Sequence, residues 1–509
     1  MDAWRALFAS RSTWAALALS LWTGAAATCL SVGSAAWILA RSFPGPRWSR
    51  LVAALGPMLA VPHAAFGIGL VFLIAPSGWL LRVFSPWATG FTAPPPWSTT
   101  QDPWGLGLIV VLVAKEVPFL LWAAASHLQR AEVARRFTLE IQVARSMGYA
   151  AGTAWWRVVW PQLWPRFLWP VLAVLAYSLT VVDVALVIGP GSPPTLAVLA
   201  WTWLLDADLA SNAQGAAAAW LLAFVLALVA SLFWRLARLP LWRARRTNGH
   251  RGYLHGPRRD LYPAPGFAVL VVLYLAVTLA MTLGSVSGVW AFPHLLPQTF
   301  SFEAWASVWA STTTLSTTLT LGLASSLGAL LWSVAWLETA PRRWDALLRR
   351  LVYLPLVLPS VLWVLGVHAT ALRFGLDARW SGLWLAHCLA CVPYVLITLS
   401  PAYSNFDPRY RWIAATLGHG RAAFLWRVKW PLLRASLASA LAVGFAVSVA
   451  QYLPTLFVGA GRYATVTTEA VTLASGAQRS LTSAYAWLQC LLPITAFTWA
   501  AWAGRPRRF

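Results

Sequence analysis

Lysine is almost absent from this chain, which has only Lys115 and Lys429 among its 509 residues. A P-loop that binds nucleotide phosphates needs the sequence Gly-Lys-Ser or Gly-Lys-Thr. Neither lysine follows a glycine, because Ala114 precedes the first and Val428 precedes the second. The chain therefore has no ATP-hydrolysing loop of that type, and any energy that it takes from ATP must reach it through another protein.

Charged residues of both signs are also scarce, at 10% of the chain, while 59% of the residues are hydrophobic. The mean hydropathy of +0.64 lies well outside the range of soluble globular proteins. The few charges are mostly basic, with 38 Lys and Arg against 15 Asp and Glu. In a soluble protein this balance would suggest nucleic-acid binding. In a membrane protein, basic residues hold loops in the cytoplasm and contact anionic lipid, so we expect a polytopic protein in a lipid bilayer that binds no nucleic acid.

The four cysteines all fall inside apolar runs, which argues against a disulfide framework or a zinc site. The spacing of Cys388 and Cys391 resembles a redox motif, but it lies within an expected membrane span and has no second pair. His63, His368 and His387 also fall in apolar runs and lack a second ligand at helical spacing. We interpret them as hydrogen-bonded packing residues, and we expect no metal site and no cofactor.

Long apolar runs are abundant in the sequence. A helix needs about 20 apolar residues to cross a hydrocarbon core of roughly 30 Å. About 11 runs of this kind are present, with 12 as the alternative, near residues 14–40, 52–75, 105–126, 167–189, 216–235, 266–290, 312–337, 351–372, 381–400, 435–458 and 484–503. The expected fold class is therefore an all-α polytopic membrane protein.

Basic residues concentrate in alternate breaks between these runs, and such breaks face the cytoplasm. The breaks at 127–166, 235–260 and 403–434 hold 6, 8 and 6 Lys and Arg residues. We therefore expect these three segments and the C-terminus in the cytoplasm, and an odd number of spans then places the N-terminus outside. A signal peptide cleaved near Ala25–Ala27 is the alternative interpretation of the N-terminal run.

Two of the basic segments, one in each half of the chain, contain copies of one motif. Gln142–Pro161 (QVARSMGYAAGTAWWRVVWP) and Trp412–Pro431 (WIAATLGHGRAAFLWRVKWP) align without a gap, so that Gly148 falls on Gly418. Glycine suits a helix stop and proline suits a helix start. Each copy thus predicts a short helix that ends near the glycine, a turn, and a second helix that begins close to the Trp-Pro. Small residues and exposed cations would make this hairpin a docking surface for another protein; an amphipathic interfacial elbow is the alternative.

The repeat extends beyond the motif. Residues 2–4 (DAW) match residues 303–305 (EAW), and Pro62 matches Pro359. Three spans precede and two follow each motif, so the halves form a parallel repeat about an axis along the membrane normal. The expected organisation is a first module at 1–238 with its loop at 127–166, a basic cytoplasmic linker at 239–262, and a second module at 263–509, which has one extra leading helix and its loop at 403–434.

From Ala144 and Ala414 onward, both copies read Ala-x3-Gly-x9-Val-x-Trp-Pro. This pattern resembles the EAA loop of binding-protein-dependent ABC importer permeases, whose sequence is Glu-Ala-Ala-x3-Gly-x9-Ile-x-Leu-Pro. Gln142 and Trp412 stand where that family has its glutamate. The fused pair of modules resembles the thiamine and ferric-iron importer permeases, and an uncharacterised fused-permease branch near them, which implies a MetI-like core of five helices in each module.

In that family the loop is a coupling helix seated in a cleft of the ATPase subunit. The resemblance implies two partners, an ABC ATPase that acts as a homodimer with one protomer under each loop and an external solute-binding protein, and it places the chain in the bacterial inner membrane. It implies ATPase-coupling roles for Gln142, Ala144, Gly148, Arg157, Pro161, Trp412, Ala414, Gly418, Arg427 and Pro431. The chain itself is then a transport subunit without catalytic residues.

Polar residues deep in the apolar runs are candidates for the translocation path. Asp183 lies in the span after the first motif, and Gln451 and Tyr452 interrupt the matching span of the second half. Lys115 and Glu116 lie in the span before the first motif. A structural ion pair between Lys115 and Asp183 is the alternative to a role in the path, and packing between helices is the alternative for Gln451 and Tyr452.

The sequence favours the permease subunit of an ATP-driven ABC importer that takes a small solute from an external binding protein into the cytoplasm. An ion-coupled secondary transporter or channel is the alternative, and it predicts ionisable relays deep in the spans. A membrane-embedded enzyme is a third hypothesis, which the lack of a clustered catalytic or metal-binding set disfavours.

Overall fold

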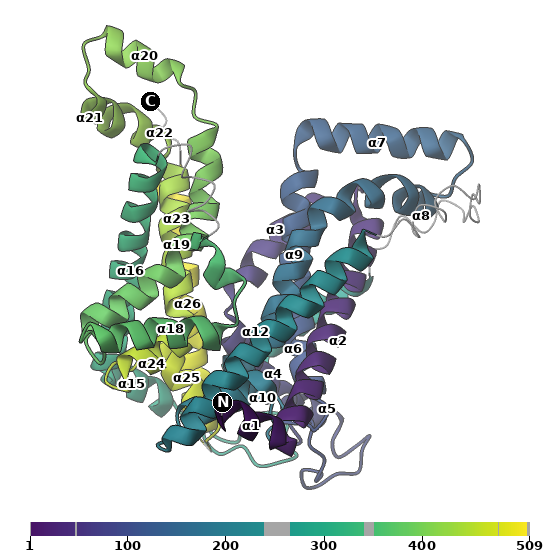
Figure 1. The fold of residues 1–509 in the computed structure, drawn as a ribbon. Helices are drawn as coiled ribbons and strands as arrows, with labels where there is room; N and C mark the ends of the chain where they lie inside the picture. The colour runs from purple at the N-terminus through teal and green to yellow at the C-terminus, as the bar shows by residue number, and fades with distance from the viewer. Residues whose placement is uncertain (1, 46–47, 239–264, 341–350, 477, 506–509) are drawn as a thin grey trace. The chain divides into compact units, whose positions relative to one another are not determined.

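We describe the fold from a computed structural model of the chain, for residues 2–45, 48–238, 265–340, 351–476 and 478–505 (Figure 1). The regular structure over these ranges is helical, apart from one isolated antiparallel bridge between Ser287 and Phe300. The predicted all-α fold is thereby confirmed. The basic linker predicted at 239–262 lies outside the described residues.

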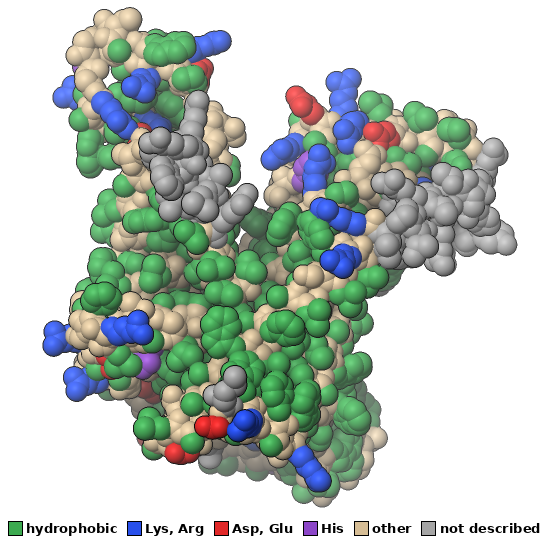
Figure 2. Space-filling model, in the orientation of Figure 1, with side chains coloured by type: hydrophobic (Ala, Val, Ile, Leu, Met, Phe, Trp, Pro, Cys, Tyr) green, Lys and Arg blue, Asp and Glu red, His purple; other side chains and the backbone are tan. Residues whose placement is uncertain are grey.

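Seven helices in the described ranges are long and apolar enough to cross a membrane, and one bent pair would make an eighth. The pair joins Arg421–Leu432 to Arg434–Val449 at an angle of 77°. The seven are Arg11–Ser42 (α2), His63–Phe84 (α4 with α5), Leu106–Leu128 (α6), Leu209–Ala237 (α12), Gly266–Ser285 (within α14, Pro265–Ser285), Thr312–Thr339 (α16) and Trp380–Ser404 (α19). Hydrophobic side chains cover much of the visible surface of these helices (Figure 2).

The run expected at 52–75 is divided into two helices, and its counterpart in the second half is divided at the matching proline. Helix α3 (Trp48–Ala60) ends before Pro62, and α4 (His63–Ile74) begins after it. In the second half, a 3₁₀ turn at Leu354–Leu356 and Pro359 precede α18 (Ser360–Arg373). Proline has no N–H for the helical ladder, so the backbone breaks where a continuous span was expected.

The runs expected at 167–189 and 435–458 are divided as well. Helix α9 (Trp160–Thr180) stops before α10 (Asp183–Ile188), and α23 (Arg434–Val449) stops before α24 (Leu453–Gly459). The new helix starts in the same register in both halves, because Leu186 N–H donates to the Val182 carbonyl at 2.8 Å and Leu456 N–H to the Tyr452 carbonyl at 3.0 Å. Each module therefore carries two broken helices at equivalent positions.

The chain forms two compact units. The first comprises Met1–Leu59, Phe66–Leu283 and Trp290–Gln298, and the second comprises Ala60–Ala65, Gly284–Val289 and Thr299–Phe509. Most of α14, which the sequence assigns to the second module as its extra helix, thus packs in the first unit. Its Tyr274 ring lies 4.6 Å from the Phe66 ring, and a Cβ at Gly69 would lie 2.7 Å from Val277 Cγ1. Only glycine at position 69 permits this close approach of the two helices.

The repeat inferred from the sequence is visible in matching elements of the two units. Helices α1 (Asp2–Ala9) and α15 (Glu303–Ala310) have equal length, as do α11 (Leu196–Leu204) and α25 (Val466–Ala474). One hydrogen bond recurs at the start of the latter pair. Leu196 N–H donates to Ser20 Oγ at 2.8 Å, and Val466 N–H donates to Thr318 Oγ1 at 2.9 Å. Hydroxyl groups of α2 and α16 thus satisfy N–H groups that a helix start leaves unpaired.

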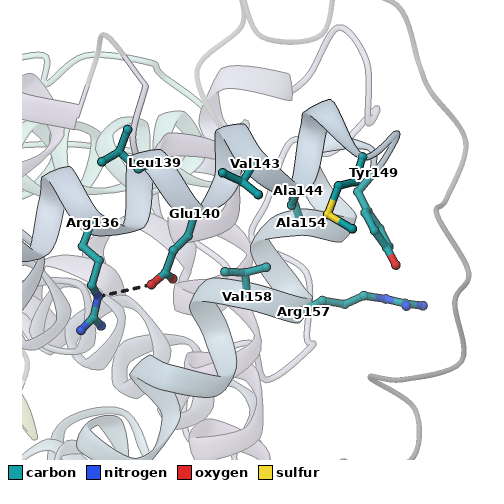
Figure 3. Close-up of a pocket in the computed structure, with 10 residues that line it drawn as sticks. Arg136, Leu139, Glu140, Val143, Ala144, Tyr149, Ala154, Arg157 and Val158 are labelled. Carbon is teal, nitrogen blue, oxygen red and sulfur yellow. Dashed lines mark ion pairs between the residues drawn. The ribbon is translucent and has the colours of Figure 1, made fainter.

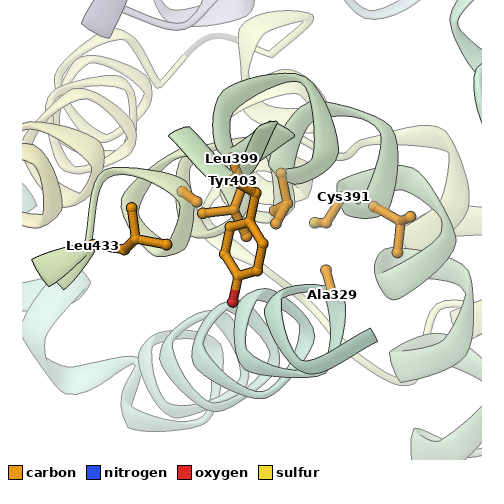
Figure 4. Packing of buried hydrophobic residues seen from close by; sticks show 8 residues of the cluster. Ala329, Cys391, Leu399, Tyr403 and Leu433 are labelled. Atoms are coloured by element: carbon orange, nitrogen blue, oxygen red, sulfur yellow. The ribbon is translucent and has the colours of Figure 1, made fainter. Parts of the chain in front are cut away.

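A buried apolar cluster joins α16, α19 and α23 of the second unit, and Trp430 of the second motif packs against it. Figure 4 shows Ala329, Cys391, Leu399, Tyr403 and Leu433 in this cluster. The Cys391 thiol donates to the Gly444 carbonyl at 3.2 Å, and the Cys388 thiol to the Ser325 carbonyl at 3.6 Å. Both thiols therefore contact helix backbone in the way expected of packing cysteines.

Candidate functional site

Each copy of the repeated motif folds into a two-armed helical hairpin. The arms of the first hairpin are α7 (Ala131–Ser146) and α8 (Ala151–Ala154), and the second arm continues through a π-helical turn at Trp155–Val159 into α9. The second hairpin has α20 (Arg409–Thr416), α21 (Arg421–Phe424), a π-helical turn at Leu425–Lys429 and α22 (Trp430–Leu432). Arginine and lysine side chains lie over both hairpins (Figure 2).

Gly148 and Gly418 end the first arm of their hairpins in the same way. Their φ angles are +87° and +74°, in the left-handed region that favours glycine. Gly148 N–H donates to the Arg145 carbonyl at 3.0 Å, and the following residue, Tyr149, donates to the Ala144 carbonyl at 3.1 Å. The second hairpin repeats both bonds, from Gly418 to Ala415 at 3.0 Å and from His419 to Ala414 at 2.9 Å. This pair of backbone hydrogen bonds is a Schellman helix stop, and the stop predicted at both glycines is confirmed.

An α-helix begins at each Trp-Pro, as predicted: α9 at Trp160 and α22 at Trp430. The second arm as a whole begins earlier, at Ala151 and Arg421, which the sequence did not predict. A proline inside an α-helix clashes with the carbonyl four residues earlier, and a π-helical turn widens the ladder at that point. Both copies have such a turn directly before the Trp-Pro. Trp160 N–H bonds to the Trp155 carbonyl in the first copy, and Trp430 to Leu425 in the second. Each proline therefore lies at the start of an α-helix and within an arm that a π-helical turn makes longer.

Large apolar side chains are exposed at matching positions of the two hairpins. Val143, Met147 and Trp156 are 59%, 60% and 43% exposed. Their counterparts in the second copy, Ile413, Leu417 and Trp426, are 56%, 70% and 70% exposed. Val143 lies in the last turn of α7 and Met147 is the C-cap residue four positions later, so their side chains share a face. Because these side chains lie in segments rich in arginine, outside the long apolar helices, each hairpin presents an apolar surface suited to a protein partner.

The motif residues divide into a buried set and an exposed set. Ala144 and Ala414 are buried within their hairpins, while the outer surface includes Gln142, Trp412, Arg427 and Pro431. Arg157 is half-buried, with its guanidinium carbon 5.8 Å from the centre of the Tyr149 ring. Pro161 is half-buried in the second arm. Gly152 and Gly420 have no atom within 4 Å of an added Cβ, so the chain itself does not require glycine there for packing.

The two hairpins are stabilised by different polar contacts. In the first, Arg136 and Glu140 form an ion pair at 3.4 Å, and the Gln162 side chain donates to Glu140 at 2.7 Å and accepts from Arg136 at 3.0 Å. In the second, Lys429 pairs with Glu338, at the end of α16, at 2.6 Å, and both side chains are largely buried. The first network lies within its hairpin, whereas the second connects its hairpin to a long helix.

Removing the Lys429–Glu338 pair should loosen the second hairpin. We expect Lys429→Met to make the second hairpin detach from α16 more often. The Glu338 carboxylate would keep only its 3.9 Å contact with Arg421, beside the 2.7 Å bond that Arg421 donates to the Glu338 backbone carbonyl. Loss of about 1 to 2 kcal/mol would raise the open fraction by a factor of about 5 to 30. The measurement is the rate of tryptic cleavage after Arg411 in the detergent-purified chain. Glu338→Gln should have the same effect and the double variant no more than either one; equal rates in all four proteins would contradict this role.

The predicted path residues lie at the equivalent helix breaks. Asp183 is the first residue of α10 and is half-buried. Gln451 and Tyr452 form the break before α24. The Gln451 side-chain amide donates to the Val447 carbonyl at 3.2 Å, and the Gln451 backbone carbonyl accepts from the Thr455 hydroxyl at 2.8 Å. Their role in the path and the pairing of Asp183 with Lys115 stay predictions.

Lys115 is one of the most deeply buried side chains, at 2% exposed. Its ammonium donates to the Met58 carbonyl at 2.8 Å and lies 5.7 Å from the centre of the Tyr274 ring. In a continuous helix the Met58 carbonyl would accept from the N–H of residue 62, four positions later. Residue 62 is a proline and has no N–H, so this carbonyl needs another donor. Lys115 therefore caps the broken end of α3, a role that sequence analysis missed although the four-residue spacing to a proline was available.

A neutral polar network at the second break was also missed. The buried His387 ring lies 2.8 Å from Ser448 Oγ and 3.0 Å from Thr455 Oγ1. The Thr467 hydroxyl donates to the Val449 carbonyl, and the Gln489 side chain donates to Thr467 at 2.8 Å. These residues come from α19, α23, α24, α25 and α26 (Arg479–Ala503) and are far apart in sequence. The interpretation of His387 as a hydrogen-bonded packing residue is confirmed.

Known proteins resemble the chain over different extents. No protein-family model matches it. The inner membrane ABC transporter permease protein YnjC of Escherichia coli is 36% identical, over 99% of this chain and 92% of that protein. The thiamine transport system permease protein ThiP of Brucella suis is 32% identical over 23% of this chain and 25% of its own length. The molybdenum transport system permease protein ModB of Mycobacterium tuberculosis is 34% identical over 21% of this chain and 46% of its own length.

Proposed function

The chain belongs to the ABC transporter permeases, and from that premise we propose that it is the membrane subunit of an ATP-driven importer of a small solute. The observation that carries the proposal is the paired hairpin. Two segments from opposite halves of the chain share a Schellman stop, a π-helical turn and three exposed apolar positions. Two like surfaces on one chain fit two like partners, as a homodimeric ATPase would provide.

The ATPase is a separate chain in this proposal, because neither lysine here follows a glycine as a P-loop requires. Its protomers would bind the apolar surfaces of the hairpins, one at each. Gln142 and Trp412, at the position of the family's glutamate, carry no charge, so the contact depends on shape and apolar burial more than on an ion pair. The residues given coupling roles from the sequence keep those roles here as proposals.

The solute would move where the helices are broken. Helix breaks place polar backbone and side chains at membrane depth, which is tolerated where they face protein or a water-filled cavity. The breaks beside Asp183 and at Gln451 and Tyr452 fall at equivalent positions of the two modules. Closure of the ATPase dimer would move the hairpins together and open the chain outward toward a solute-binding protein, and ATP hydrolysis would reset it. The step is mechanical and needs no covalent chemistry from this chain.

Isolation of the tagged full-length chain from its native membrane tests this function. We expect an ABC ATPase and vanadate-sensitive ATP hydrolysis to accompany it. A chain whose solute uptake follows an ion gradient and continues after ATP is exhausted would instead be an ion-coupled transporter, the class for which the buried Lys115 and Glu116 are the supporting observation.

A further inference from the structure

The first hairpin contains a pocket of about 540 Å³ between its two arms (Figure 3). Its walls include Val143 from α7 and Val158 from the π-helical turn, with Ala144 and Ala154 between them. Ala154 is 1% exposed, so the inner end of the pocket consists of a small apolar side chain. Met147, one of the exposed apolar residues of the proposed docking surface, also lines the pocket.

The charges of the pocket lie at its two ends. Arg136 and Glu140 lie at one end, where they form an ion pair and balance each other's charge. Gln162 also donates a hydrogen bond to Glu140 there. Arg157 and Tyr149 lie side by side at the other end (Figure 3). The charged lining residues are two arginines and one glutamate. An apolar interior with a positive end is complementary to an apolar side chain that has a carboxylate beside it.

The second hairpin has large aromatic residues at the same positions. Phe424 stands where the first hairpin has Ala154, and Phe406 and Tyr410 stand where it has Arg136 and Glu140. Phe424 is 6% exposed, and its ring lies 6.2 Å from that of Phe406, which lies 5.6 Å from that of Tyr410. The second hairpin therefore has packed aromatic rings at the positions where small and charged side chains line the pocket of the first.

Resting on the proposed function, we propose that the two hairpins bind the ATPase differently. The first takes a bulky apolar side chain of the ATPase, flanked by an acidic residue, into the pocket, and the second binds through its outer apolar surface alone. Two identical ATPase protomers would then meet unequal sites on one chain. Burial of one large apolar side chain contributes about 1.5 to 3 kcal/mol, which makes the first site the stronger one by a factor of roughly 10 to 150 when nothing offsets it.

Photo-crosslinking in the assembled complex distinguishes the two sites. A benzophenone amino acid is placed at Met147 or at the matching Leu417, and the ATPase adduct at each position is measured. We expect Ala154→Phe, which gives the first hairpin the residue of the second, to lower the adduct at position 147 at least fivefold and to leave that at 417 unchanged. Ala151→Phe, at an exposed position outside the pocket, is the matched control and should change neither.

A second variant fills the pocket without changing the buried Ala154, in case Ala154→Phe misfolds. Val143→Trp fills the pocket from its exposed rim, and it should lower the adduct at 147 in the same way. An undiminished adduct at 147 in a folded variant overturns the pocket proposal, as does a crosslinked ATPase peptide without an acidic residue beside an apolar one. The proposed function fails separately, if the unmodified complex gives no ATPase adduct at either hairpin.

Discussion

Replacing Gly148 and Gly418 together by glutamate should release the ATPase from the purified transporter. Both glycines have positive φ, and a side chain there costs about 1 to 2 kcal/mol per residue. In the undocked variant, each hairpin can relieve that strain by leaving the left-handed conformation, so that the helix stop is lost. Docking would then have to re-form the strained stop. The combined loss of about 2 to 4 kcal/mol corresponds to roughly 30- to 1000-fold weaker binding. The measurement is the amount of ATPase retained per permease chain during affinity purification.

Two matched pairs of variants separate strain from charge in this experiment. Asparagine tolerates the left-handed conformation, so Gly148→Asn with Gly418→Asn should retain most of the ATPase. Glutamine has the size of glutamate without its charge, and the glutamine pair should fall between the other two. At Gly418 no atom lies within 4 Å of an added Cβ, so a direct clash within the chain does not explain a loss there. Equal retention in all three pairs would show that the helix stops do not position the docking surface.

Lys115→Met should destabilise the first unit by about 1 to 3 kcal/mol, the cost of leaving a buried polar group without its partner. The substitution removes the ammonium that donates to the Met58 carbonyl at the broken end of α3. The measurement is the thermal unfolding midpoint of the purified protein in detergent, which should fall relative to the unmodified chain. A role in binding the solute alone would leave that midpoint unchanged.

Pro62→Ala provides the control for this role of Lys115. Alanine restores an N–H at position 62, which an α-helix can offer to the Met58 carbonyl. In the Pro62→Ala background, Lys115→Met should therefore lower the midpoint less than it does alone. A loss of the same size in both backgrounds would show that Lys115 stabilises the unit through other contacts.

Local sequence patterns were sufficient to predict the hairpins and the repeat. A glycine followed by a proline at fixed spacing in both halves located Gly148 and Gly418, whose conformation depends on the absence of a Cβ. The π-helical turns were not predictable in the same way. They depend on how the arm accommodates Pro161 and Pro431, and the sequence alone equally permits an arm with no helix before the Trp-Pro.

The broken spans show where local patterns are insufficient. Pro62 and Pro359 mark two of the breaks, but the break at Val181 and Val182 has no such mark, because Pro170 lies 11 residues before it and Gly189 lies 7 residues after it. The network around His387 joins five helices, so no local pattern contains it. The packing of α14 in the first unit depends on Gly69 meeting Val277, which lies far away in the sequence. Contacts of that kind follow from tertiary structure and are not visible in apolar periodicity.

The mass of the intact transporter tests the central claim most directly. Native mass spectrometry of the complex purified from its membrane should give one copy of this chain with two copies of an ABC ATPase, because one chain carries two docking hairpins. Loss of ATPase mass from the Gly148→Glu, Gly418→Glu variant should accompany loss of ATP hydrolysis. A chain that is isolated without an ATPase and still transports its solute on an ion gradient would contradict the account.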